Sequence, residues 1–268
     1  MKTPPQILGI LAALLLAAPL ACAQGAQGPL PPPPKFEVHR IPTVPHPGPP
    51  PIPEQEIIQR FAAKENVQKK LYDSYTFTQS IRIEEEMESG GQFAAVGEVY
   101  TKPGGGRFWR PTQPLQDTLK FTDFSAGDVQ VVVDLPLFFL TTAEIPNYDF
   151  IYTGQDKLDE LNTYVFQVTP KTYSRTQRYF QGAIWVDDHD LSIVESYGKF
   201  VTDVSDRNPK LPFAMFDTYR ENFQGQYWLP TYTSADDYLD SKNGRIHLKL
   251  VVRSTNFKLT TAQPSPKP

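Results

Sequence analysis

The alternation of apolar and polar positions is clearest in the middle of the chain, where aromatic and β-branched residues alternate with polar ones. Such alternation is typical of half-buried β-strands. Polar, turn-forming segments divide this stretch into three predicted strands, at residues 163–169, 178–186 and 191–197. Because the connections are short, the pattern predicts an antiparallel meander.

The same period-two pattern continues on both sides of the meander. Further strands are expected at residues 75–83, 92–102, 107–110, 119–124, 148–153, 217–223, 227–238 and 245–259. About ten strands are too many for a flat open sheet, so the predicted sheet curls toward an open barrel. Within the meander, Phe180, Gly182 and Ile184 are expected to share the inner face of that sheet.

One helix is predicted, from Glu54 to Asp73. Pro53 precedes it, and Glu54 and Glu56 suit the positive end of the helix dipole. Its apolar residues form an incomplete stripe made up of Ile57, Phe61, Ala62 and Leu71. Such a stripe is expected of a helix that packs on a sheet.

The most apolar segment beyond the N-terminal region runs from Val129 to Leu140, and Pro136 interrupts it. A proline prevents the segment from forming one uninterrupted central strand or helix. Either the segment fills the interior of the curved sheet, or it lines a pocket for an apolar ligand. Residues 211–216 have the same character, so both segments are expected as loops over the concave face.

The first 23 residues predict an export signal. Lys2 supplies a positive charge, residues 7–18 are apolar, and Ala21-Cys22-Ala23 provides small residues for cleavage. In this interpretation the protein is exported to the periplasm without spanning the membrane, because the apolar run is too short for a transmembrane helix. An alternative interpretation makes Cys22 a lipid-modified first residue that anchors the protein to a membrane.

Three further regions follow the predicted signal. Residues 24–53 are rich in proline and predict an extended linker. Residues 54–259 are expected to form one domain, and residues 260–268 a disordered polar tail.

Composition narrows the function classes. Lys and Arg are scattered and the formal net charge is −4, which argues against nucleic-acid binding. A single cysteine excludes an internal disulfide and a cysteine-based zinc site. Because neither Gly-x-Ser-x-Gly nor His-Glu-x-x-His occurs, no enzyme, metal or cofactor is predicted. His189 is interpreted as part of the polar turn Asp187–Asp190 and not as a metal ligand.

Three stretches of the sequence resemble a known family. They are YVFQVTPKT at 164–172, YFQGAIWVDDHDLSIVESYGKF at 179–200 and YWLPTYTSADDYL at 227–239. With the opening helix and the meander, they make residues 54–259 similar to the LolA-like outer-membrane lipoprotein-sorting superfamily. This superfamily includes periplasmic lipoprotein carriers, lipid-binding surface lipoproteins and a periplasmic sensor module that regulates a membrane anti-sigma factor.

The resemblance implies a mainly β (α+β) fold in which a curved antiparallel sheet forms an open half-barrel, with an N-terminal helix and loops over its concave face. It also implies an apolar concave surface that receives acyl chains. Carriers of this superfamily use an arginine to hold the lid, and Arg82, Arg107 and Arg110 are the candidates here.

The expected function is that of an exported, nonenzymatic lipid or lipoprotein carrier of the bacterial cell envelope. The residues expected to line its cavity are Trp109, Leu135, Leu137, Phe138, Phe139, Leu140, Phe166, Ile184, Phe213 and Met215. The alternative is an envelope sensor or scaffold whose cavity is filled by its own side chains and which acts through a protein partner.

Overall fold

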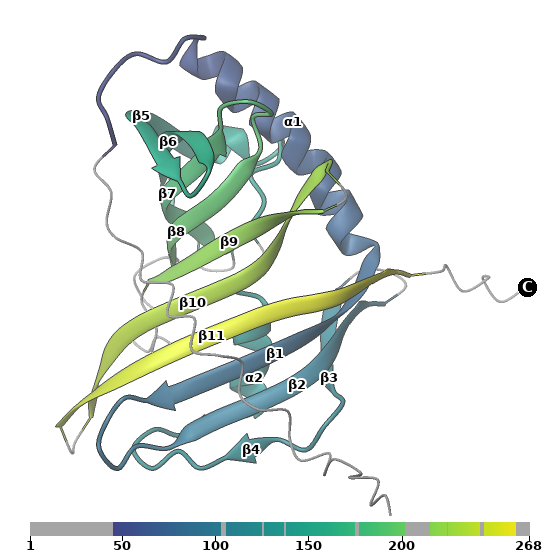
Figure 1. Ribbon diagram of the computed structural model, residues 1–268, viewed down its shortest axis with the longest axis vertical. Coiled ribbons are helices and arrows are strands. Elements are labelled where there is room, and N and C mark those ends of the chain that lie inside the picture. The colour runs from purple at the N-terminus through teal and green to yellow at the C-terminus, as the bar shows by residue number, and fades with distance from the viewer. Residues whose placement is uncertain are drawn as a thin grey trace, which may run out of the picture. The chain divides into compact units, whose positions relative to one another are not determined.

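A computed structural model describes residues 45–102, 106–124, 126–136, 138–174, 177–201, 215–223, 225–241 and 244–260. Within them, eleven antiparallel strands form one sheet (Figure 1): β1 (Tyr75–Glu85), β2 (Gln92–Thr101), β3 (Arg107–Pro111), β4 (Gln116–Asp117), β5 (Tyr148–Leu158), β6 (Leu161–Pro170), β7 (Tyr179–Asp187), β8 (Ile193–Val201), β9 (Phe216–Phe223), β10 (Tyr227–Ser241) and β11 (Gly244–Leu259). The predicted meander corresponds to β6, β7 and β8.

The order of strands along the sheet is β3-β2-β1-β11-β10-β9-β8-β7-β6-β5, and β4 pairs with β2. Among the described strands, β3 and β5 stand at opposite ends of this order, so the sheet stays open. The predicted fold class, an open half-barrel of curved antiparallel sheet, is confirmed. β11 pairs with β1 on one side and with β10 on the other, which brings the two sequence ends of the sheet together at its middle.

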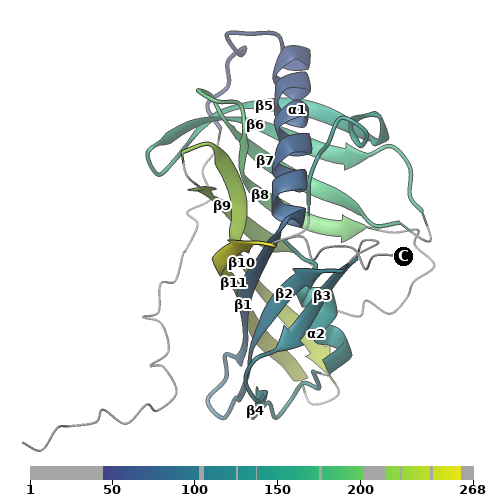
Figure 2. The same ribbon diagram turned by 90° about the vertical axis from the view of Figure 1, so that its right-hand side faces the viewer.

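The predicted helix is confirmed as α1 (Glu54–Asp73), which crosses one face of the sheet (Figure 2). In its N-terminal half, the Phe61 ring lies 6.3 Å from that of Phe166 on β6. At its C-terminal end, the Tyr72 ring lies 5.2 Å from that of Phe77 on β1. The helix therefore covers strands from both halves of the sheet, and the face beneath it is called the inner face below.

The apolar segment 129–140 begins as a helix that the sequence pattern does not predict. This helix, α2 (Ala126–Val133), buries Val129, Val132 and Val133 in the main core, and Figure 1 shows it behind β1 and β2. It ends three residues before Pro136, as expected for a proline that cannot continue a helix. A short 3-10 helix, η1 (Ile145–Asn147), precedes β5.

The strand expected at 119–124 is wrong. The backbone N–H groups of Lys120, Phe121 and Thr122 donate hydrogen bonds to the Glu85 carboxylate at 3.0, 2.8 and 2.9 Å. Because these N–H groups are occupied by a side chain, they do not pair with a neighbouring strand. The segment thus packs against the end of β1 as irregular backbone.

Contacts divide the chain between Pro42 and Thr43, and every described residue belongs to the second unit. The predicted export signal, Cys22 and the linker up to residue 44 lie outside the described residues and stay predictions. In the described part of the linker, His46 pairs with Gln155 on β5. No helix in the described part of the chain has the length and apolar character needed to cross a membrane.

Candidate functional site

An aromatic stack holds the apolar segment 135–140 against the inner face. The Phe138 ring stacks on that of Phe180 in β7, with centroids 4.0 Å apart and planes at 27°. Beneath Phe180, Gly182 and Gly198 pair across β7 and β8. A Cβ on Gly182 or Gly198 would lie 3.0 or 2.6 Å from Cζ of Phe180, so both glycines leave room for that ring. Gly182 therefore faces inward, as predicted.

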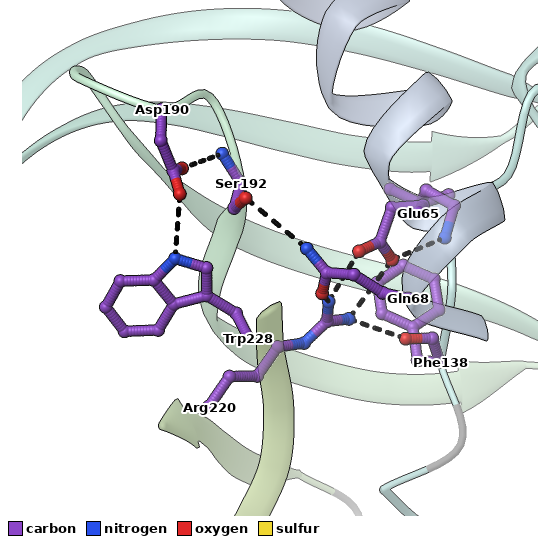
Figure 3. Close-up of polar contacts among 8 residues, drawn as sticks. Glu65, Gln68, Phe138, Asp190, Ser192, Arg220 and Trp228 are labelled. Carbon is purple, nitrogen blue, oxygen red and sulfur yellow. Dashed lines mark hydrogen bonds and ion pairs between the residues drawn. The ribbon is translucent and has the colours of Figure 1, made fainter. Parts of the chain in front are cut away.

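A buried ion pair fixes the backbone of the same segment (Figure 3). Arg220 of β9 contacts both carboxylate oxygens of Glu65 in α1, at 2.6 and 3.2 Å. Its Nη2 also donates to the carbonyl oxygen of Phe138 at 2.7 Å. The second Glu65 oxygen accepts a hydrogen bond from the backbone N–H of Leu140 at 3.1 Å. We call this group of four residues the latch, because it joins the helix, the sheet and the apolar segment.

The burial of the latch makes each of these contacts matter. The Arg220 and Glu65 side chains are 2% and 0% exposed. Removing one partner of a buried pair typically costs about 3–5 kcal/mol, because the remaining charge has lost its compensation. The apolar segment thus depends on a charged contact that is strong only while all its partners are in place.

The latch continues into the polar turn between β7 and β8. Gln68 of α1 lies 3.4 Å from Arg220 and donates to the Ser192 hydroxyl at 3.3 Å. The Asp190 carboxylate then accepts hydrogen bonds from the Ser192 N–H at 2.8 Å and from Nε1 of Trp228 at 3.1 Å (Figure 3). The turn between β7 and β8 thus helps to position α1, through the hydrogen bond between Ser192 and Gln68.

Electrostatics within this turn shift the pKa values of two acids, the buried Asp187 and the half-buried Asp190, in opposite directions. Burial opposes ionisation of Asp190, but hydrogen bonds from Trp228 and Ser192, together with Lys64, outweigh it and lower its pKa. Burial raises the pKa of Asp187, and the charge of Asp190 adds to that effect although backbone hydrogen bonds oppose it. No group of three or more His, Cys, Asp or Glu side chains that could hold a metal ion occurs within the described ranges.

The residues predicted to line a cavity do not all meet. The structure brings five of them into the main core around the apolar segment, namely Leu135, Phe138, Leu140, Phe166 and Ile184. Phe139 is half-buried, and its ring lies 5.1 Å from the Arg220 guanidinium and 5.6 Å from the Tyr72 ring. Met215 is also half-buried, just before β9.

Trp109 lies apart from this group, on β3 at the other end of the sheet, where it packs against the same core. Leu137 and Phe213 lie outside the described residues. The assignment of these residues as ligand contacts stays a prediction.

The arginine that contacts the apolar segment is not one of the three considered from the sequence. Arg107 donates to Asp73 at 2.8 Å and stacks on the Tyr72 ring at the end of α1. Arg82 and Arg110 form ion pairs at the surface. In the part of the chain that the structure describes, Arg220 fills the role of holding the segment.

A sequence signal for the latch exists but is weak. Glu65 and Gln68 follow Phe61 and precede Tyr72 at helical spacing, so they continue the buried stripe of α1 with polar side chains. Arg220 and Phe216 are four residues apart on β9 and therefore share its inner face, so Arg220 likewise places a polar side chain at a buried position. Polar residues at positions that the periodicity predicts to be buried are expected to pair with one another. The periodicity does not identify which residues form each pair.

Comparisons with known proteins were made for the sequence and for the fold. No family model matches the sequence, and no curated protein matches it. Among solved structures, a LolA superfamily protein from Nitrosomonas europaea is 16% identical, covers 79% of this chain and 96% of its own, and gives a TM-score of 0.44.

Two further solved structures are similar at the same level of sequence identity. A DUF1329 family protein from Desulfovibrio piger is 13% identical over 76% of this chain and 95% of its own, with a TM-score of 0.35. A domain described as an outer-membrane lipoprotein-sorting protein from Vibrio parahaemolyticus is 10% identical over 76% of this chain and 94% of its own, also with a TM-score of 0.35. The descriptions of two of these three structures name the superfamily that the sequence resembles, at identities of 16% and 10%.

Proposed function

We propose that this protein is an exported, nonenzymatic binding protein that shelters acyl chains of lipids or lipoproteins on the inner face of its sheet. In this proposal the apolar segment 135–140 is a lid, and the latch holds it closed. The observation that carries the proposal is the attachment of Phe138, whose ring covers an apolar surface while its carbonyl is held by Arg220.

The surface beneath the lid suits an acyl chain. Phe166, Phe180 and Ile184 are fully buried on the inner face and carry no polar side-chain atoms. Binding there would draw on apolar burial, at about 0.8 kcal/mol for each methylene removed from water. Such binding requires no set of polar groups around the methylenes of the acyl chain. A lid that opens and closes over the apolar surface is sufficient for binding.

A second function is favoured by a different observation. Phe138 and Leu140 are 7% and 0% exposed. These two residues of the apolar segment are therefore as deeply buried as the core residues of the inner face, and they fill that face. A protein whose inner face is permanently filled would be an envelope sensor or scaffold that acts through a protein partner.

Binding of a fluorescent long-chain fatty acid decides between the two functions. The wild-type protein, purified without detergent, is expected to bind the probe. Phe138→Ala is expected to bind it more tightly although the fold is less stable, because the Phe138 ring no longer competes for the place on Phe180. Phe108→Ala is the matched control, since Phe108 is exposed on β3 and both measurements should stay unchanged.

Two results would favour the sensor or scaffold. One is a wild-type protein that binds no probe. The other is a Phe138→Ala variant that loses stability, by about 3–5 kcal/mol for a buried Phe, and gains no binding, since the ring would then be ordinary core.

The proposed export is tested separately by intact-mass measurement of protein from its native host. A mature chain that starts at Gln24 supports export as a free protein. A chain that starts at a diacylglyceryl-modified Cys22 replaces it with the membrane-anchored alternative.

A further inference from the structure

Four polar side chains gather on the inner face near the C-terminal end of α1. They come from four elements: Tyr72 from α1, Gln79 from β1, Trp109 from β3 and Ser254 from β11. Gln79 lies opposite Ser254 on one neighbouring strand and opposite Gly97 on the other. Paired residues on one face have Cβ positions about 5 Å apart, so Gln79 lies at the centre of this group.

Gly97 brings the Trp109 indole beside Gln79. A Cβ on Gly97 would lie 2.2 Å from Cε2 and 2.5 Å from Nε1 of Trp109, so the indole covers the glycine directly. A side chain at position 97 would push the ring away. The indole and the Gln79 side chain therefore lie on the same face, over paired positions of β2 and β1.

Tyr72 belongs to α1, which crosses the inner face, and it joins the group from the helix side. Its ring packs on Phe77, which lies two residues before Gln79 on the same face of β1. Burial raises the pKa of the Tyr72 hydroxyl to about 12, and a hydrogen bond with the Ser254 side chain acts in the opposite direction.

Two members of this group, Gln79 and Trp109, carry buried polar atoms without partners. Gln79 and Tyr72 are both 0% exposed. Among the described residues, no hydrogen-bond partner is found for the amide nitrogen and oxygen of Gln79 or for Nε1 of Trp109. Buried polar groups almost always have a partner, and leaving one unpaired costs stability. Two side chains in this state on one face of the sheet, Gln79 on β1 and Trp109 on β3, point to a ligand group that pairs with them.

We propose that Gln79, Trp109, Tyr72 and Ser254 form a polar subsite for the neutral acyl carbonyl, in an ester or amide, that heads the bound acyl chain. The proposal rests on the proposed function and adds the part of the ligand that is read by hydrogen bonds. An indole N–H can only donate, while an amide side chain and the hydroxyls can do both. Donors thus predominate, which suits a carbonyl oxygen that accepts up to two hydrogen bonds.

The neighbouring residues give the chain its direction. Phe77 and Ile81 flank Gln79 on the inner face of β1, and both belong to the main core. A carbonyl held at Gln79 would place the methylenes that follow it on apolar side chains. Polar recognition is therefore confined to one end of the ligand.

A set of dodecyl probes tests the subsite by competition with the fluorescent fatty acid. Methyl dodecanoate and N-methyldodecanamide carry the neutral carbonyl, dodecanoic acid carries a charged one, and dodecyl methyl ether has none. The wild-type protein is expected to bind the ester and the amide about 10-fold more tightly than the ether, which corresponds to one or two hydrogen bonds.

Gln79→Leu is expected to remove this preference and to leave the affinity for the ether unchanged. Trp109→Phe, which loses the N–H but keeps an aromatic ring, should reduce the preference as well and serves if the first variant folds poorly. The matched control is Gln167→Leu, because Gln167 is exposed on β6, and the control should keep the wild-type preference.

Several results would overturn the subsite. Equal binding of ester, amide and ether by the wild-type protein would do so while acyl-chain binding itself stands. A preference for dodecanoic acid alone, or a Gln79→Leu variant that keeps the preference for ester and amide, would also overturn it. A wild-type protein that binds none of the four probes would remove the proposed function together with the subsite.

Discussion

Replacing Arg220 with lysine separates a lid that opens from a segment that merely packs. Lysine keeps the positive charge, but its single ammonium cannot reproduce the planar fork that reaches both Glu65 oxygens and the Phe138 carbonyl. At least one of these buried acceptors is left without its donor. The substitution thus weakens the closed position of the apolar segment more than it changes the surface beneath it.

The size of the effect follows from the hydrogen bonds that lysine cannot make. An unsatisfied buried acceptor costs about 1–3 kcal/mol, and the expected fall in the free energy of unfolding lies in this range. If the cost falls only on the closed state, the population of the open state rises by the same free energy. An apparent dissociation constant that is limited by opening should then decrease by about 5- to 150-fold at most.

The assay combines chemical denaturation with titration of the fluorescent fatty acid. Arg220→Lys is expected to be less stable and to bind more tightly, two changes that rarely occur together. Arg110→Lys is the matched control, because Arg110 forms an exposed pair with Glu98, and exposed pairs contribute little. Loss of stability with unchanged or weaker binding in Arg220→Lys would refute the idea that the latch limits access to the inner face.

Two further substitutions test the scaffold. Gly182→Val should lower the free energy of unfolding by about 1–3 kcal/mol through overpacking, because a Cβ there would lie 2.2 Å from the carbonyl oxygen of Tyr197; thermal unfolding at the wild-type temperature would contradict this. Burial opposes ionisation of Glu85, but hydrogen bonds from the backbone of Gly91, Lys120 and Phe121 and from the Thr122 hydroxyl outweigh it and lower its pKa. A lowered pKa stabilises the fold above the unfolded-state pKa and ceases to do so as the pH falls through the folded-state value. Wild type should therefore exceed Glu85→Gln in stability at pH 7, and the difference should shrink below about pH 4; a difference that does not change with pH in denaturation experiments would show that the Glu85 charge is unimportant.

Local periodicity predicts most of this fold. The opening helix and the strands of the meander follow patterns that each segment carries by itself, so the pattern predicts α1 with its correct ends. The failures lie where distant residues decide the local structure. α2 is a helix although it is rich in valine, which favours strands, because burial of Val129, Val132 and Val133 on one side determines the outcome.

The candidate site is predictable from the sequence only in its apolar half. The apolarity of segment 135–140 and the interruption at Pro136 are visible in the sequence and lead to Phe138 and Leu140. The ion pair is not predictable in this way, because Arg220 and Glu65 are 155 residues apart in the chain. A period of two or 3.6 marks both positions as buried, but only the three-dimensional order of the strands decides which buried cation meets which buried acid.

The position of β11 has a consequence for how the chain folds. This strand is the last in the sequence, yet it lies between β1 and β10 near the middle of the sheet, with Val252 paired to Ile81 of β1 and to Thr233 of β10. Among the described strands, β11 is the one that connects β1–β4 with β5–β10. Contacts this distant in sequence slow folding, because a long loop must close before they form. Assembly of the sheet therefore waits for nearly the whole chain, and the inner face remains incomplete until its last strand is in place.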